Sequence, residues 1–398
     1  MKLRQLLRRA LTFTFPTVLL VIAFSVSGVQ DTPSNLFDPL YSVFLDLMGH
    51  FYQPDRIDSQ QALYGALKGM LEHLEDPYTS FMEPEELDHF LESLDGAFSG
   101  VGIEITMQDD VLTVITPLVG SPAEQAGILV GDKILSVDGV TTDGETLSQS
   151  ALRIRGEIGS TVVLTVLHED GSTEEISIVR ELIEIEAVRY DSYQDGEIAY
   201  IRILRFENDT VPELDEALMS FDLDAITGLI LDLRNNAGGY MPSAIEVSDH
   251  FVNGDNQQKL LIVKQRGRQP TTYFAMNDEI PDFPIAILIN RGTASASEIT
   301  AGAIRDNNMG ILIGQKSFGK GVIQSLVEYG SESPLPGSAL KVTSGEYLTP
   351  SGYAVNGVGL TPDILVEEDQ DPIETAIEWI NEHAGTVMPM AIGAESTP

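Results

Sequence analysis

The sequence predicts a multidomain α/β protein with three parts: a helical segment, a β-rich module and a larger α/β core. The helical segment is predicted because apolar residues recur at steps of three and four between Leu36 and Phe51. The β-rich module is predicted because short runs rich in β-branched residues alternate with glycine turns in residues 96–186. The α/β core is predicted because an apolar strand, a turn and a helix follow one another repeatedly within residues 187–366.

Residues 1–30 have the pattern of an export segment. Basic residues near the start precede an apolar run from Leu11 to Val29, and small residues lie near the end of that run. The run is also long enough to span a bilayer, so a cleaved signal peptide and an uncleaved membrane anchor both fit it. In either case the body of the chain is exported, to the periplasm or the extracellular space. A buried core helix is the alternative interpretation.

Residues 31–95 are predicted to be helical. The amphipathic stripe between Leu36 and Phe51 is followed by a second helix from Ala62 to Leu74. Helices that are too short to close a core of their own usually pack on a neighbour. Contact between two copies of the chain, as in a homodimer, therefore fits this region.

Strands and helices can be assigned to the β-rich module and to the core. In residues 96–186 the expected strands are 101–105, 111–115, 133–137, 161–166 and 175–179, and the expected helices are 121–126 and 146–155. In residues 187–366 the expected strands are 197–203, 226–233, 284–289 and 311–313, and the expected helices are 241–252 and 298–306. Repeated strand–turn–helix units imply parallel strands joined by right-handed crossovers. Residues 367–398 are expected to form an acidic helix, near 372–382, and an unstructured tail.

The composition argues against several classes of protein. The formal net charge is −38, whereas sequence-independent binding of nucleic acid or anionic lipid requires clustered lysine and arginine. The chain contains no cysteine, which excludes disulfides, thiolate metal sites and a cysteine nucleophile.

A serine in the segment Asn290–Ile299 is the candidate nucleophile, because it lies where an apolar strand turns into a helix. Free N–H groups and the positive end of the helix dipole would stabilise an oxyanion at that point. A structural interpretation competes, because Ser295-x-x-Glu298 also fits a capping box in which the hydroxyl only satisfies a backbone donor.

Lys320 is the candidate base. It lies between two glycines in Ser317–Gln324, in a chain with only eight lysines. None of the six histidines lies beside a serine-elbow motif, and G-x-S-x-G is absent from the sequence. A lysine can replace the imidazole of a histidine if burial lowers its pKa towards neutrality.

Three segments together resemble the C-terminal processing peptidases, the tail-specific serine proteases that carry a PDZ domain. They are Asn290–Ile299, the Phe-Gly-Lys-Gly-x-x-Gln segment at 318–324, and Leu231–Gly239. The resemblance covers about residues 35–370 and implies a layered β-spiral core similar to Clp protease and crotonase subunits. It also implies that the nucleophile lies 25 residues before the lysine, which selects Ser295 over Ser297. Lys320 is then the general base and acid, Gln324 orients it, and neither a metal nor a nucleotide cofactor is needed.

The resemblance further implies an oxyanion hole. A glycine N–H of Gly239 or Gly238 would join the N–H of Ala296 in it, although the glycines also fit a purely structural turn. An aspartate discussed in some family members falls on Asp306. We interpret Asp306 as structural, because eleven helical residues place it about 16 Å along the axis from Ser295.

Residues 96–186 resemble a PDZ domain in its bacterial, permuted order, on the segments Ser99–Ile103 and Gly131–Gly139. The resemblance implies that the N–H groups of Val101, Gly102 and Ile103 bind the carboxylate of a substrate's C-terminus. The peptide would add as a strand beside residues 101–105, over a groove floored by the helix 146–155. A structural β-turn is the alternative interpretation of the glycines.

These observations predict an exported serine endopeptidase that cuts proteins near their C-termini. Its expected substrates are proteins with free, flexible, apolar C-termini, and the sequence leaves open whether a regulatory partner exists. An exported PDZ scaffold without catalytic activity is the alternative from another class. An α/β hydrolase of esters is disfavoured by the missing serine elbow.

Overall fold

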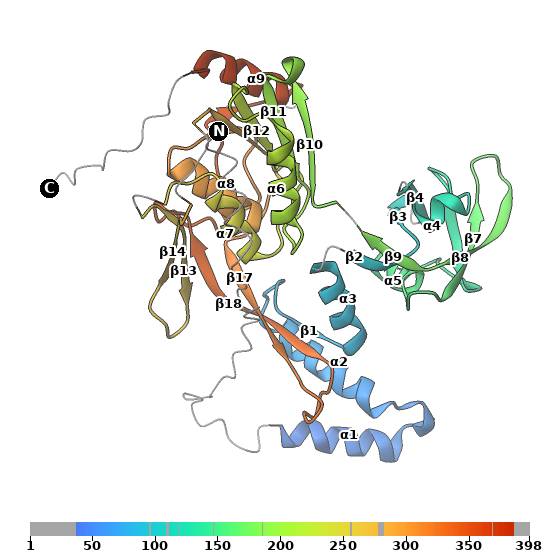
Figure 1. The fold of residues 1–398 in the computed structure, drawn as a ribbon. Coiled ribbons are helices and arrows are strands. Elements are labelled where there is room, and N and C mark those ends of the chain that lie inside the picture. Colours follow the sequence, from blue (N-terminus) through green and yellow to red (C-terminus); the bar gives the residue numbers. More distant parts are fainter. Residues whose placement is uncertain are drawn as a thin grey trace.

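The structure is a computed structural model that describes residues 37–385, with gaps at 95–96, 109–110, 119, 146, 185, 255–256, 278–281 and 368. A helical N-terminal region, a β-rich lobe and an α/β body follow one another along the chain (Figure 1). The predicted export segment and the predicted tail after residue 385 lie outside the described residues. Within the described ranges, no helix combines the length and the hydropathy needed to cross a membrane.

In the described residues, the N-terminal region contains the two predicted helices, a third α-helix and a short 3-10 helix, and a strand joins it to the body. The helices are α1 (Asp38–His50), the short 3-10 helix η3 (Pro54–Arg56), α2 (Ser59–Glu72) and α3 (Pro84–Leu94). Helix α2 begins at Asp58, whose carboxylate accepts the N–H groups of Gln60 and Gln61. Between α2 and α3, β1 (Ser80–Met82) pairs antiparallel with a strand of the body.

The β-rich lobe is an antiparallel sheet closed by two helices. Its elements are β3 (Ile103–Gln108), β4 (Val111–Pro117), α4 (Pro122–Gln125), β5 (Lys133–Val137), β6 (Val140–Thr141), α5 (Leu147–Ile154), β7 (Thr161–Leu167) and β8 (Thr173–Val179). The strand order β3-β4-β5-β7-β8 leaves β3 at an edge. The strand expected from residue 101 begins at Ile103, because Gly102 has a positive φ of 74° and turns the chain. Where the chain enters and leaves the lobe, β2 (Ala97–Gly100) pairs with β9 (Glu181–Glu184).

The body contains the expected parallel sheet. Its strands, in spatial order, are β10 (Val188–Tyr193), β11 (Ile198–Ile203), β12 (Gly228–Asp232), β15 (Ile285–Ile289), β16 (Ile311–Gly314) and β19 (Ile364–Leu365). All neighbouring pairs are parallel except β10 with β11. One face packs on α6 (Thr210–Ser220), α7 (Met241–Asp249) and α8 (Ala296–Asp306), and the other face packs on α9 (Pro372–His383). Because β12 and β15 are buried on both faces, they read as continuous apolar runs.

A second, antiparallel sheet was not predicted from the sequence. It contains β13 (Lys259–Gln265), β14 (Thr271–Phe274), β17 (Val322–Glu328) and β18 (Ala339–Leu348), and β1 pairs with its strand β18. The hairpin of β17 and β18 extends from the body to the N-terminal helices (Figure 1). Most residues of β17 and β18 are half-buried on both faces, so their sequences show little alternation of apolar and polar residues.

Candidate active site

Ser295 lies at the N-terminus of α8, where the chain leaves β15 and turns into the helix. Its backbone has φ 55° and ψ −116°, a conformation that non-glycine residues rarely adopt and that is typical of strained functional turns. Its side chain remains partly exposed. Ser297 is fully buried instead, and its Oγ donates to the carbonyl oxygen of Asn236 at 2.9 Å. Of the two serines, Ser295 is therefore the one that a substrate could reach.

Glu298 joins the serine turn to the lysine loop. Its fully buried carboxylate accepts the N–H of Ser295 and the N–H of Lys320, both at 2.9 Å. The other carboxylate oxygen accepts Ser317 Oγ at 2.5 Å and the N–H of Gly319 at 2.8 Å. Burial raises the pKa of Glu298 above its ordinary value, and these hydrogen bonds oppose that shift.

The predicted capping box is present at the start of α8: the Ser295 side chain faces the N–H of Glu298, and the Glu298 carboxylate accepts the N–H of Ser295. The N–H of Glu298 also donates to the carbonyl oxygen of Ser295 at 2.8 Å. Glu298 has more than the capping role, because its carboxylate also binds the lysine loop.

Tyr347 forms a second link between the same two segments. Its buried hydroxyl on β18 lies 3.1 Å from the carbonyl oxygen of Ser295 and 2.9 Å from that of Lys320. Sequence reasoning missed this residue, because nothing near Tyr347 in the chain points to a serine 52 residues away. The backbones at Ser295 and Lys320 are consequently held together on both sides.

Lys320 is half-buried near the end of the loop between β16 and β17. Burial, together with the positive charge of Lys341 on β18, holds the pKa of Lys320 below its ordinary value. Its Nζ lies 4.8 Å from the ring centroid of Tyr78. No hydrogen bond joins this Nζ to Ser295 or Gln324 within the described residues, and the Nε2 of Gln324 is buried without a partner. The fold brings the predicted residues into one region, and catalytic hydrogen bonds of this kind commonly tighten only when substrate binds.

The glycine turn after β12 packs directly against the serine. A Cβ added to Gly238 would lie 2.8 Å from both the Cβ of Ser295 and the backbone nitrogen of Ala296. The N–H of Gly238 donates to Oδ1 of Asn236 at 2.9 Å, so it is not free to bind an oxyanion. The N–H groups of Gly239 and Ala296 have no such acceptor among the described residues. Of the two predicted glycines, Gly239 is therefore the one whose N–H has no acceptor among the described residues.

Buried polar side chains fix this turn. Asn236 donates its Nδ2 to the carbonyl oxygen of Ile203 at 2.8 Å and is almost fully buried. At the end of β12, the buried Asp232 accepts Tyr200 Oη at 2.7 Å and Arg234 Nη2 at 2.6 Å. The sequence predicted the glycine turn and its oxyanion donors, but not these bonds of Asn236 and Asp232.

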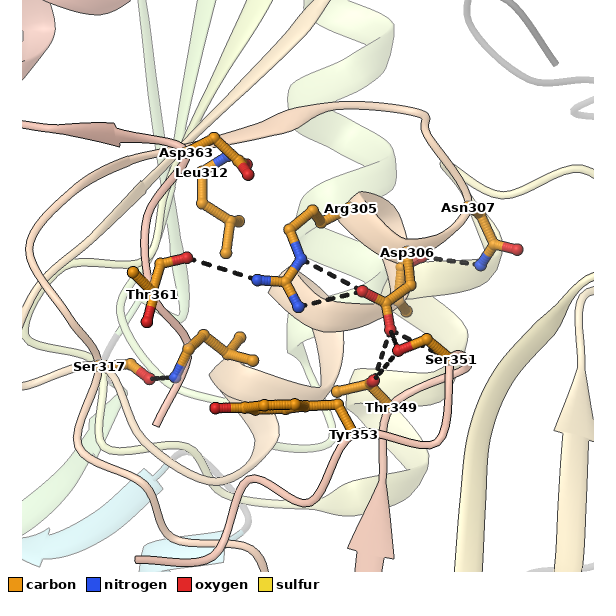
Figure 2. A network of polar contacts seen from close by, with 12 residues as sticks. Arg305, Asp306, Asn307, Leu312, Ser317, Thr349, Ser351, Tyr353, Thr361 and Asp363 are labelled. Carbon is orange, nitrogen blue, oxygen red and sulfur yellow. Dashed lines mark hydrogen bonds and ion pairs between the residues drawn. The ribbon is translucent and has the colours of Figure 1, made fainter. Parts of the chain in front are cut away.

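Asp306 lies in a separate network at the far end of α8 (Figure 2). One carboxylate oxygen pairs with Arg305 Nη2 at 3.0 Å. The other accepts the Oγ of Ser351 at 2.6 Å, the N–H of Ser351 at 3.1 Å and the hydroxyl of Thr349. These contacts attach the end of the helix to the segment after β18, as the structural interpretation of Asp306 expects.

The three predicted peptide-binding residues lie where the chain enters edge strand β3. The carbonyl oxygen of Val101 accepts the N–H of Ala123, and that of Gly102 accepts the N–H of Leu118, both at 2.9 Å. Ile103 begins β3, whose outer edge has no neighbouring strand in the described sheet, and α5 contacts β3. An edge strand beside a helix is the geometry that admits a peptide as an added strand.

Two families of known proteins match parts of the chain. Residues 197–366 match peptidase family S41, and residues 99–179 match the PDZ domain family. A carboxy-terminal-processing protease of Bartonella bacilliformis is 38% identical over 320 residues, which cover 78% of this chain and 71% of that protein. A probable CtpA-like serine protease of Staphylococcus aureus strain COL is 33% identical over 364 residues, which cover 89% of this chain and 71% of that protein.

A solved structure agrees with these sequence matches. A photosystem II D1 C-terminal processing protease superposes with a TM-score of 0.54 at 30% identity, covering 88% of this chain and 91% of that one. The described architecture, a helical N-terminal segment, a PDZ lobe and a mixed α/β body, therefore confirms the fold class predicted from the sequence.

Proposed function

The chain belongs to the carboxy-terminal-processing serine proteases of peptidase family S41, and on this premise we propose that it uses Ser295 as nucleophile and Lys320 as base. The observation that carries the proposal is the pair of links through Glu298 and Tyr347. They fix the backbone of a strained, accessible serine beside that of a half-buried lysine. A structural capping serine would not require the lysine loop to be held in this way.

Each residue has a defined part in the reaction. Neutral Lys320 takes the proton of Ser295 as the serine oxygen attacks the substrate carbonyl carbon. The resulting oxyanion is bound by the N–H of Ala296, at the N-terminus of α8, and by the N–H of Gly239, in the turn after β12. The ammonium of Lys320 then gives its proton to the leaving amine as the C–N bond breaks. In the second half, neutral Lys320 takes a proton from a water that attacks the acyl carbon, and it returns that proton to the Ser295 oxygen as the ester bond breaks. Gln324, whose buried Nε2 has no hydrogen-bond partner among the described residues, orients the lysine.

The PDZ lobe supplies the position of the cut. Its open strand edge at Ile103 and the turn at Val101 and Gly102 would bind the free C-terminus of a substrate with an apolar tail. Export to the periplasm or extracellular space, with or without a retained membrane anchor, remains part of the proposal and rests on the pattern of residues 1–30. Helix α1 buries none of its side chains, which supports contact with a second copy of the chain or with a regulatory partner.

Single and double variants test the catalytic pair. Ser295→Ala and Lys320→Ala should each abolish removal of a flexible apolar tail from a test protein, followed by mass spectrometry, and the double variant should be no worse. Lys320→Arg should also be inactive, because arginine does not lose its proton in this pH range. Ser297→Ala is the matched control and should keep substantial activity. The proposal fails if Ser297→Ala is the inactive variant, or if folded Lys320→Arg cleaves at the wild-type rate.

A further inference from the structure

The N-terminal region lays two aromatic rings on two lysines of the body. The Nζ of Lys320 lies 4.8 Å from the ring centroid of Tyr78, and the Nζ of Lys341 lies 5.4 Å from that of Phe90. Both distances are within the range in which a ring face attracts an ammonium group. Tyr78 precedes β1 and Phe90 is on α3, so both rings come from outside the parallel sheet that carries Ser295.

Hydrogen bonds fix the position of Tyr78. Its N–H donates to Oδ1 of Asp76 at 3.0 Å, and Oδ2 of Asp76 accepts the hydroxyl of Thr79 at 2.6 Å. The hydroxyl of Thr79 in turn accepts the N–H of Thr343 on β18 at 3.0 Å. Immediately afterwards, Ser80 pairs with Lys341 in the β1–β18 register. The ring therefore has a defined place relative to the lysine loop.

Apolar packing supports the same contact. Met82 and Leu87 are buried with Ala339 of β18 in a small core that also includes Phe90 and Leu326. This core joins β1 and α3 to the β17–β18 hairpin. The N-terminal region is thus part of the surroundings of Lys320.

We propose that Tyr78 is a positioning residue for the general base, and that the N-terminal region thereby sets the pH range in which the protease works. This inference rests on the proposed function, in which Lys320 is that base. The ring attracts the ammonium form of Lys320 and holds it away from Ser295. When the lysine loses its proton, the attraction is lost and the free amine can turn to the serine hydroxyl.

The groups around Lys320 have opposing effects on its protonation. The ammonium of Lys341 on β18 and burial both favour the neutral form, whereas the ring of Tyr78 favours the charged form. Glu298 on α8 and Tyr347 on β18 bind only the backbone of Lys320. Among the described residues, the contact with the Tyr78 ring is therefore the one that opposes deprotonation of the Lys320 side chain.

Two substitutions separate the effect of the aromatic ring of Tyr78 from that of its hydroxyl. Tyr78→Leu removes the π face, so neutral Lys320 should form at lower pH. The acid limb of the kcat/KM profile should then move down by about half a unit to one unit, and activity below the limb should rise about threefold or more. Tyr78→Phe keeps the face and should leave the limb at its wild-type position. An unmoved limb in Tyr78→Leu, or an equal shift in Tyr78→Phe, would overturn the proposal.

A readout without catalysis separates this inference from the proposed function. The titration of Lys320 can be followed in the inactive Ser295→Ala variant. Formaldehyde and a borohydride reductant methylate a lysine only in its neutral form, and peptide mass spectrometry measures the labelled fraction of Lys320 at each pH. Tyr78→Leu should lower the pH of half-labelling there, and Tyr78→Phe should not. If labelling shifts but Lys320→Arg still cleaves, the Ser/Lys mechanism is wrong and the ring contact is real. If labelling does not shift, the role of Tyr78 is wrong whatever the mechanism.

Discussion

Replacing Gly238 with alanine should damage the active site through one added methyl group. Gly238 has φ 99°, and an added Cβ would lie 2.7 Å from the carbonyl oxygen of Ala294 and 2.8 Å from the Cβ of Ser295. These neighbours belong to the serine turn itself and cannot rotate away. The turn must therefore shift or the glycine segment must withdraw from it. Gly196 offers a matched control, because it has φ 96° but nothing within 4 Å of its added Cβ.

The magnitude follows from separating backbone strain from steric overlap. Both substitutions force alanine into a left-handed conformation, which costs about 1–2 kcal/mol of folding free energy. Only Gly238→Ala adds overpacking against the serine turn, which costs about 1–3 kcal/mol more. A displacement of the nucleophile by a fraction of an ångström to 1 Å should lower kcat/KM by up to about 100-fold.

Urea unfolding and peptide cleavage would measure the two effects. Gly196→Ala should lose stability through strain alone and keep wild-type kcat/KM, whereas Gly238→Ala should lose more stability and most activity. Equal loss of stability in both variants, with unchanged kcat/KM in Gly238→Ala, would refute the close packing of the glycine turn on Ser295.

Three further predictions concern charged residues, two at the candidate site and one, the buried Glu207 before α6, outside it. Glu298→Gln should lower the free energy of unfolding in urea by about 3 kcal/mol or more and sharply reduce kcat/KM, because the NH2 group of glutamine cannot accept the two hydrogen bonds that one carboxylate oxygen accepts. Glu246→Gln at an exposed position is the control, and equal behaviour of the two variants would contradict the link from Glu298 to the lysine loop. Lys341→Met removes a charge that lowers the pKa of Lys320, so the acid limb of kcat/KM should move to higher pH, and a limb that stays or falls would contradict this coupling. Burial raises the pKa of Glu207 to about 7, so its protonated form stabilises the folded state at low pH, and this stability should be lost as the pH rises through about 7. Urea midpoints measured from about pH 5 to pH 8 should fall in the wild type and stay level in Glu207→Gln. A wild-type midpoint that does not change with pH would count against the prediction.

The parallel sheet and the serine turn could be predicted because their signals are local. About ten residues of sequence are enough to recognise the apolar runs at β12 and β15 and the serine at the start of α8. The PDZ strands were located in the same way, with β5 (Lys133–Val137) matching its expected bounds. Ser295 was selected over Ser297 by family spacing, and the structure adds the physical reason, which is that Ser297 is buried against Asn236.

The second sheet could not be predicted because its pairings join distant parts of the chain. Ser80 pairs with Lys341, and Lys264 pairs with Glu346, so no local pattern contains either partner. The roles of Tyr347 and Tyr78 depend on that sheet and were missed with it. Glu298 was recognised as a capping residue, but its bond to the N–H of Lys320 requires the lysine loop to be in place.

The two residues of the proposed catalytic pair adjoin different sheets, so both sheets must form before the pair is assembled. Ser295 follows a strand of the parallel sheet, whereas Lys320 leads into the antiparallel one, and Tyr347 joins them from β18. During synthesis the serine turn is complete before β18 has been made. In the proposed mechanism, a nascent chain would therefore contain Ser295 before Lys320 is anchored. If Ser295 and Lys320 act together as proposed, we expect proteolytic activity to arise only after β18, near the C-terminal end of the body, has folded.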